Sequence, residues 1–232
     1  MRPRLVRAVY GALGGDLSEN DDPITPVCEA VECFHKASLI HDDIQDGDVE
    51  RYGREALHVK VGIPMAIAVG DWLVAKGYTL IASSGFGASG EMLAAAATSH
   101  LRLCEGQAME LSVRESGESP ATEKVLEIFA LKTGEAFALA AELGAMAAGA
   151  GARIVDEARS FALDLGVAFQ IDDDLEDGGG LLLKSCGGER SRIAALRQKF
   201  VQRAESVIEA SLFRESREKI TGLILSRDIR LV

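Results

Sequence analysis

The chain has 232 residues, 47% of them apolar and 26% charged, so it is long and apolar enough to bury a sizeable core. Its net charge of −11 argues against nucleic-acid binding, which depends on clustered basic side chains that neutralise phosphates. We expect no transmembrane segment, because no uninterrupted apolar run reaches about 18 residues, and no signal peptide. Four cysteines without zinc-site spacing indicate free thiols, and therefore a reducing, cytoplasmic location.

The predicted elements are helices throughout. Alanine and leucine recur at three- and four-residue spacing, proline and aromatic residues are scarce, and no segment alternates as a strand would. We therefore predict an all-α fold, a single-domain helical bundle formed by residues 1–232. In chain order, the predicted helices span residues 3–13, 26–46, 64–83, 90–113, 121–133, 134–149, 152–177, 190–211 and 214–227.

Two stretches interrupt the helical pattern. Residues 47–62 are polar and carry four basic side chains, Arg51, Arg54, His58 and Lys60. The triplet Gly178-Gly179-Gly180 ends the long helix predicted from residue 152. Each stretch directly follows a cluster of aspartates, so each cluster lies at the end of a predicted helix.

The first aspartate cluster is Asp42, Asp43 and Asp46. Asp42 and Asp46 are four residues apart and share one face of a helix, where their carboxylates repel one another. A bound cation would reverse that repulsion. Carboxylate oxygens suit Mg²⁺, which takes one or two of them and completes its coordination with water and substrate phosphate.

The second cluster, Asp173, Asp174 and Asp177, repeats the four-residue spacing 131 residues further along the chain. Each cluster alone could be a solvated acidic helix end. However, both follow strongly apolar helical segments, and carboxylates at the mouth of an apolar channel are costly unless they are paired or metal-bound. Two such arrangements favour a pair of facing metal sites.

Six motifs occur in a fixed order along the chain. They are His41-Asp42-Asp43-Ile44-Gln45-Asp46, Arg51-Tyr52-Gly53, Gly70-Asp71, Gly106-Gln107, Lys132-Thr133 and Phe169-Gln170-Ile171-Asp172-Asp173-Asp174. With this ordered set, the sequence over roughly residues 1–177 resembles the trans-isoprenyl diphosphate synthases, also called polyprenyl synthetases. The resemblance implies a homodimeric all-α bundle of the isoprenoid synthase type, with a central cavity between two aspartate-bearing helices.

The activity implied by this resemblance is head-to-tail prenyl transfer by a polyprenyl diphosphate synthase. Three Mg²⁺ ions would bridge the aspartates and the diphosphate of an allylic substrate, and would assist departure of the diphosphate. The double bond of isopentenyl diphosphate would attack the allylic carbocation, and proton loss would restore an alkene. Small residues at Ala37 and Ser38, with Phe34 a turn below, predict a product of about C20, with C15 or longer chains as alternatives.

The resemblance also assigns roles to individual residues. Six are expected to contact substrate: Arg51 and Lys132 on the allylic diphosphate, Thr133 and Gln170 beside the reacting carbon, His35 on isopentenyl diphosphate, and Arg2 as the last arginine of a basic motif near the N-terminus. The expected metal ligands are Asp42, Asp46 and Asp173, supported by Asp43, Asp174 and Asp177. Taken singly, Lys132 could be a solvated lysine and His35 an ordinary half-buried histidine.

The sequence departs from the family pattern at three places. Tyr52 stands where the family usually has a second arginine, and tyrosine supplies no fixed positive charge for isopentenyl diphosphate. The lysine expected shortly before Arg2 is absent, as is the helix preceding it. The lysine-bearing loop expected after Asp177 is unrecognisable, and Lys184 is a poor substitute. Either the pattern has diverged or residues are absent at these two places; the intact spacing between the clusters favours absence.

Three other functions compete with the synthase. A class I terpene cyclase would share the ionisation step but usually carries an Asn/Ser/Glu pattern in place of the second cluster. A non-catalytic subunit of a heteromeric synthase is favoured by Tyr52 and opposed by the six intact aspartates. A metal-dependent phosphohydrolase using His41 and Asp42 would need a histidine constellation, which the four scattered histidines do not form.

Overall fold

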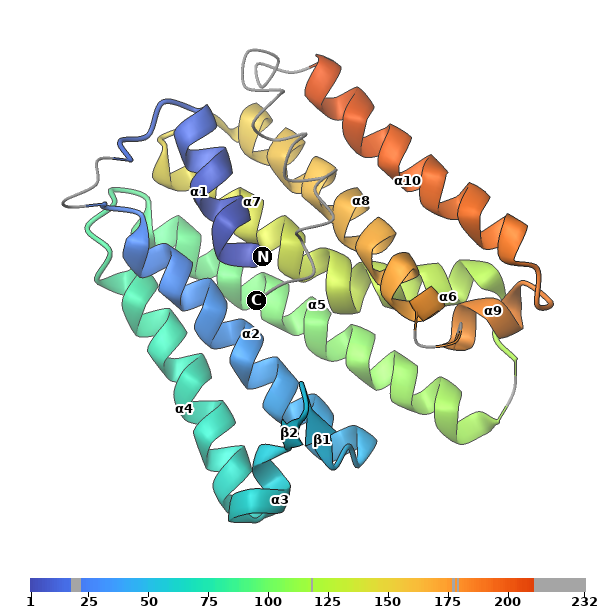
Figure 1. Cartoon of the computed structure of the whole chain (residues 1–232). Helices are drawn as coiled ribbons and strands as arrows, with labels where there is room; N and C mark the ends of the chain where they lie inside the picture. Colours follow the sequence, from blue (N-terminus) through green and yellow to red (C-terminus); the bar gives the residue numbers. More distant parts are fainter. Residues whose placement is uncertain (18–21, 118, 177, 179, 211–232) are drawn as a thin grey trace.

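The computed structural model describes residues 1–17, 22–117, 119–176, 178 and 180–210 (Figure 1). Over this part of the chain the structure is helical except for one short hairpin, which confirms the predicted all-α fold. The elements are α1 (Arg2–Ala12), α2 (Thr25–Asp46), β1 (Glu50–Arg51), β2 (Arg54–Glu55), α3 (Leu57–Val61), α4 (Ile63–Ala82), α5 (Ser89–Ser116), α6 (Thr122–Phe129), the π-helix η1 (Ala130–Gly134), α7 (Glu135–Ala147), α8 (Ala152–Glu176), α9 (Gly180–Ser185) and α10 (Arg190–Ala210).

The predicted helices lie close to their observed positions, and the differences have local causes. The helix predicted at 90–113 extends to Ser116, and the one predicted at 214–227 lies outside the described residues. The hairpin and the helices α3 and α9 were not predicted. Strands of two residues cannot show alternation, and helices of five or six residues are too short to show a 3.6-residue period.

Helix α7 forms the centre of the main core. It packs against α1 and α8, and nine of its thirteen residues are buried. Small residues allow this close approach: a Cβ atom on Gly144 would lie 2.6 Å from the carbonyl oxygen of Val6 in α1. A second apolar cluster joins α6, α8, α9 and α10. Helix α8, which carries the second aspartate cluster, is therefore packed both against α7 and within this second apolar cluster.

After the first aspartate cluster, the chain reverses its direction in the hairpin. Helix α2 ends at Gly47, whose φ of 70° is a left-handed C-cap. The hairpin turn consists of Tyr52 and Gly53, with φ values of 54° and 74°, and Arg51 pairs with Arg54 in its register. Positive φ at both turn residues is typical of a two-residue hairpin turn. The fold thereby directs Arg51 back toward α2.

Helices α4 and α10 lie at opposite edges of the bundle (Figure 1). α4 packs against α2, but only four of its twenty residues are buried, and its large exposed apolar side chains are Ile63, Met65, Ile67 and Trp72. By length and composition alone, α4 is the one described helix that could cross a membrane. α10 instead docks on α8 through Arg203–Asp164, 3.0 Å, and Arg197–Asp172, 2.6 Å.

Candidate active site

Cations from several elements neutralise the first aspartate cluster. Asp43 is only 4% exposed, and Arg51 donates to its Oδ1 from Nε at 2.7 Å. Asp46 accepts a hydrogen bond from Nη1 of Arg114, at the end of α5, at 2.5 Å. Attraction to these carboxylates outweighs the effect of burial and raises the pKa of both arginines. The carboxylates at the end of α2 are therefore ordered by the protein itself.

Asp42 lies at the meeting point of this cluster and the π-helix. Burial raises the pKa of Asp42; Lys132 opposes that shift, and repulsion from Asp46 and Glu110 adds to it. Its Oδ2 is 4.0 Å from Nζ of Lys132, which donates to Glu110 at 2.7 Å. Asp42, Asp46 and Glu110 thus share two cations, Lys132 and Arg114, which leaves negative charge for a metal cation.

The π-helix η1 presents Lys132 and Thr133 on the side facing α2 and α8. Thr133 is buried and donates from Oγ1 to Oε1 of Gln170 on α8 at 2.5 Å. Gly106 of α5 permits this position, because a Cβ there would lie 2.7 Å from the backbone nitrogen of Lys132. The structure therefore brings together the motif residues Gly106, Lys132, Thr133 and Gln170.

Arg2 and His35 form a second polar pair. Nη1 of Arg2 lies 3.0 Å from Nδ1 of His35, and burial lowers the pKa of Arg2 to about 10. Burial, together with the charge on Arg2, lowers the pKa of His35 to about 3, so the imidazole is neutral and accepts the hydrogen bond. Arg2 is attracted by both Asp42 and Asp173, which places it between the two aspartate clusters.

The second cluster stands at the end of α8. Asp172 accepts a hydrogen bond from Nε of Arg197 at 2.6 Å, whereas Asp177 lies outside the described residues. Gly180 leaves room for Asp174, since a Cβ there would lie 2.4 Å from its Oδ1. Among the described residues no group of three or more histidine, cysteine or acidic side chains could hold a metal alone.

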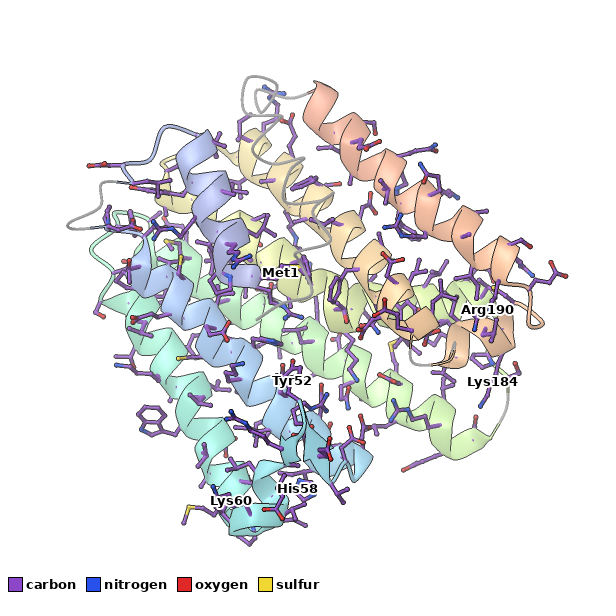
Figure 2. All side chains as sticks on the ribbon, viewed as in Figure 1. Met1, Tyr52, His58, Lys60, Lys184 and Arg190 are labelled. Carbon is purple, nitrogen blue, oxygen red and sulfur yellow. The ribbon has the colours of Figure 1, made fainter. Side chains whose placement is uncertain are left out.

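Tyr52 and Lys184, which mark two of the departures from the family pattern, lie apart from each other in the structure. Tyr52 occupies the hairpin turn and is 75% exposed, yet its hydroxyl is close enough to interact electrostatically with Arg2. Lys184 is exposed on α9, at the right-hand edge of the bundle and well apart from Tyr52 in this view (Figure 2). Lys184 is therefore badly placed to replace a cation near the hairpin.

Several motif residues have packing roles. A Cβ on Gly70 would lie 2.2 Å from Nε2 of His41, so the glycine makes room for the imidazole, which then lies 3.6 Å from Asp71. Gln107 donates to Gln45 of α2 at 2.8 Å. These contacts fasten α4 and α5 to the helix that bears the first aspartate cluster.

Sequence reasoning missed three contributors to the site. Arg114 falls just beyond the predicted end of its helix, although its spacing of four residues from Glu110 was a usable signal. Arg197 and the pair Tyr78–His100, whose Oη and Nδ1 atoms are 2.7 Å apart, have no local signature. Each depends on contacts between distant segments.

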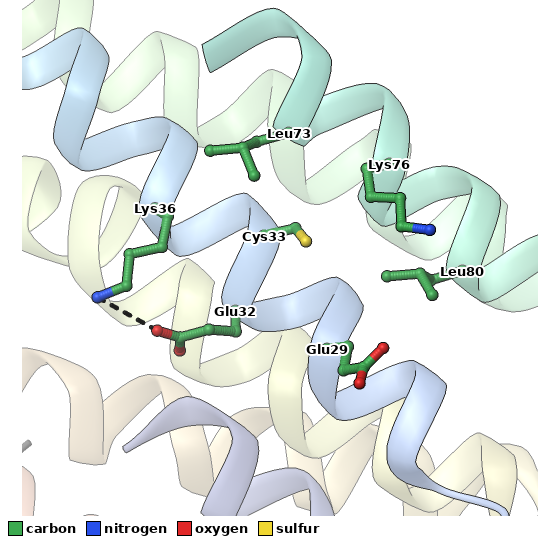
Figure 3. A pocket seen from close by; sticks show the side chains of 7 residues that line it. All are labelled: Glu29, Glu32, Cys33, Lys36, Leu73, Lys76 and Leu80. Carbon is green, nitrogen blue, oxygen red and sulfur yellow. Dashed lines mark ion pairs between the residues drawn. The ribbon is translucent and has the colours of Figure 1, made fainter. Parts of the chain in front are cut away.

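A shallow groove lies between α2 and α4, away from the predicted site residues. Cys33 points between Leu73 and Leu80, and Glu32 pairs with Lys36 at 3.3 Å along the rim (Figure 3). Burial raises the pKa of the Cys33 thiol, so it stays protonated at neutral pH. The groove contains none of the residues expected to bind metal or diphosphate.

An all-α bundle that carries aspartates on two of its helices, with a π-turn lysine and threonine between them, defines an isoprenoid synthase fold. The family model described as polyprenyl synthetase matches residues 1–180, and the chain belongs to this family. A short chain isoprenyl diphosphate synthase from Methanothermobacter thermautotrophicus is 35% identical over 178 residues, which cover 76% of this chain and 53% of that protein.

Two further proteins extend the comparison. A geranylgeranyl diphosphate synthase from Saccharolobus solfataricus is 34% identical, with 75% of this chain and 52% of that protein covered. The crystal structure of an FPP/GFPP synthase from Zymomonas mobilis has 26% identity and a TM-score of 0.86, with 98% of this chain and 82% of that chain covered. The chain thus spans about half the length of the curated relatives it matches.

Proposed function

We propose that this protein is a polyprenyl diphosphate synthase that condenses isopentenyl diphosphate with an allylic diphosphate. The observation that carries the proposal is the convergence of Lys132, Thr133 and Gln170 with Asp42, in a chain whose family relatives are named as prenyl diphosphate synthases. The relatives give no support to a cyclase or a non-catalytic subunit. We also propose that residues beyond 180 belong to the same domain, since α10 is fastened to α8 by two ion pairs.

Divalent metal ions are used throughout the family, and we propose Mg²⁺ here, three per site. Asp42 and Asp46 on α2 and Asp173 on α8 would hold the ions, with Asp43, Asp174 and Asp177 in support. Bound Mg²⁺ would neutralise the diphosphate and assist its departure. Because Asp43 is buried against Arg51, its support would act largely by orienting that arginine.

The remaining residues have distinct tasks in prenyl transfer. Arg51 and Lys132 would grip the allylic diphosphate, whose carbon–oxygen bond breaks to leave an allylic carbocation. The Thr133 hydroxyl and Gln170 amide oxygen, 2.5 Å apart, would stabilise that cation through their dipoles. Arg2 and neutral His35 would hold isopentenyl diphosphate, whose double bond forms the new carbon–carbon bond before a proton leaves.

Product length depends on what lies below the first cluster. Phe34, two turns before Asp42, is 6% exposed and packs edge-on against His100 and Tyr78, with ring centroids 4.7 and 5.2 Å away. A Cβ on Gly77 would lie 2.3 Å from the Phe34 ring, so this glycine gives the ring its place. We propose this aromatic cluster as the floor of the chain-binding channel and a product of about C20, with C15 or C25 as the nearest alternatives.

We further propose a homodimer that works in the cytoplasm. The exposed apolar face of α4, with Trp72 at 62% and Met65 at 57% exposed, is suited to cover by the same face of a second copy. Light scattering coupled to size-exclusion chromatography is expected to give twice the monomer mass of 24.7 kDa. A purely monomeric protein at micromolar concentration would refute the dimer.

The decisive test of the activity uses the full chain with Mg²⁺, labelled isopentenyl diphosphate and, in turn, dimethylallyl, geranyl or farnesyl diphosphate. We expect labelled products of about C20, and no product when the metal is removed with EDTA. Absence of incorporation with all three primers would overturn the proposal. Release of diphosphate with a hydrocarbon product would indicate a cyclase instead.

A further inference from the structure

A buried charge cluster lies immediately after the π-helix and outside the proposed substrate contacts. Glu135, the first residue of α7, is 2% exposed. Nη2 of Arg159 on α8 donates to both of its carboxylate oxygens at 2.6 Å, and Ser99 of α5 donates to Oε1 at 2.6 Å. Arg159 also pairs with Glu142 at 2.7 Å, about two turns further along the same face of α7. This cluster joins three helices at one point.

Burial of the Glu135 carboxylate costs free energy, so the presence of a charged residue at this position needs an explanation. Burial alone lowers the pKa of Arg159, but hydrogen bonds and attraction from Glu135 and Glu142 raise it overall, so the guanidinium is charged. Well-packed apolar side chains often replace buried ion pairs without loss of stability. A charge pair at this place is therefore better explained by the geometry it imposes than by the stability it adds.

The neighbouring backbone shows what that geometry is. A π-turn is rare and depends on contacts that hold it, because the ordinary α-helical hydrogen-bond pattern competes with it. On one side η1 meets Gly106 of α5; on the other, a Cβ on Gly166 of α8 would lie 2.7 Å from the Cα of Gly134. These two contacts fix the position of the turn. Glu135 directly follows the turn, and its side chain ties the end of the turn to α5 and α8.

The orientation of the π-turn determines where two site residues point. Each residue of a helix is rotated by about 100° from the previous one, so loss of the extra residue in the turn would redirect the preceding side chains. Lys132 would lose its approach to Asp42, now 4.0 Å, and Thr133 its 2.5 Å bond to Gln170. The charge cluster holds both side chains without touching either.

We propose that Glu135, clamped by Arg159 and Ser99, is a positioning residue that maintains the π-turn and thereby aims Lys132 and Thr133 at the allylic diphosphate. The catalytic consequence rests on the proposed synthase function, whereas the conformational claim does not. The matched comparison is Glu142, which pairs with the same arginine on the same helix but lies more than two turns beyond η1 along α7.

The experiment compares Glu135→Gln with Glu142→Gln in the full chain, by hydrogen exchange and by steady-state kinetics. In Glu135→Gln we expect faster amide exchange confined to residues 130–136 and a fall in kcat on the order of tenfold to a hundredfold. The KM for isopentenyl diphosphate should not change, because Arg2 is held by His35 and by the ring of Phe137 rather than by Glu135. Glu142→Gln should show neither effect, although it also breaks an ion pair.

Each result has a defined meaning. Unchanged exchange and kcat in Glu135→Gln, or equal effects in Glu142→Gln, would overturn the proposal. If the wild-type protein shows no prenyl transfer, the proposed function fails and the exchange data alone decide this inference. If Glu135→Gln does not fold, Ser99→Ala removes a single hydrogen bond to Glu135 and should give a smaller change of the same kind; wild-type exchange in that variant would count against the proposal.

Discussion

The two aspartate clusters have similar sequences but are neutralised in different ways. At the end of α2, Arg51 from the hairpin and Arg114 from α5 pair with Asp43 and Asp46, which are themselves expected metal ligands or their supports. At the end of α8, Arg197 from α10 pairs with Asp172, one residue before the expected ligand Asp173. The first set of cations pairs with the expected metal-binding carboxylates themselves, and Arg197 pairs with a carboxylate beside them.

This difference indicates how each cluster would respond to a metal ion. At the first cluster a metal ion would have to compete with Arg114 for Asp46, and Arg114 would supply a substitute positive charge in the absence of metal. At the second cluster Arg197 could remain bound to Asp172 if Asp173 took up a metal ion. We therefore expect Arg197 to orient α8 and Arg114 to compete with a metal ion for Asp46.

The largest effect is expected from removing one ligand in each cluster. Asp42→Asn and Asp173→Asn keep side-chain size but lose the negative charge that holds Mg²⁺, and each should lower kcat by about a thousandfold. Initial rates of labelled isopentenyl diphosphate incorporation measure this effect. Asp156→Asn, at an exposed position on α8, is the control. A loss below about tenfold at either site would remove that cluster from the proposed metal centre.

A smaller effect is expected from adding a cation beside the first cluster. Tyr52→Arg places a fixed positive charge near Arg2, and it should lower the KM for isopentenyl diphosphate several-fold, by about 1 kcal/mol. Tyr52→Phe separates the new charge from the loss of the hydroxyl. An unchanged KM in the arginine variant would mean that the hairpin turn does not border the isopentenyl diphosphate site.

Much of this architecture could be predicted from sequence because the signals are local. Helix α2 was predicted as 26–46 and is observed as Thr25–Asp46, since apolar periodicity and Pro26 define it without help from other segments. The roles proposed for Lys132 and Thr133 came from the family resemblance. Their orientation could not be foreseen, because a π-turn and an α-turn share the same residue pattern, and the turn packs against the distant residues Gly106 and Gly166.

The missed residues have the same explanation. Arg114 and Asp46 are 68 positions apart, and Arg197 and Asp172 are 25 apart, so neither pair leaves a trace in local spacing. A charged residue on a predicted helix is usually solvated, and only tertiary structure shows which one faces the site. The asymmetry between the clusters is therefore a property of the fold rather than of the motifs.

The smallest effect tests that asymmetry directly. Arg114→Met removes the competitor for Asp46, so the Mg²⁺ concentration for half-maximal activity should fall by up to about fivefold, as expected for a partly exposed ion pair worth up to about 1 kcal/mol. Arg197→Met removes an ion pair of similar length and exposure beside the second cluster, and it should leave this concentration unchanged. Titration of both variants and the wild type with Mg²⁺, at a fixed substrate concentration, measures these shifts. Equal shifts in both variants would show that these arginines act only through net charge, whereas a rise in Arg114→Met would make that arginine a support for the metal site.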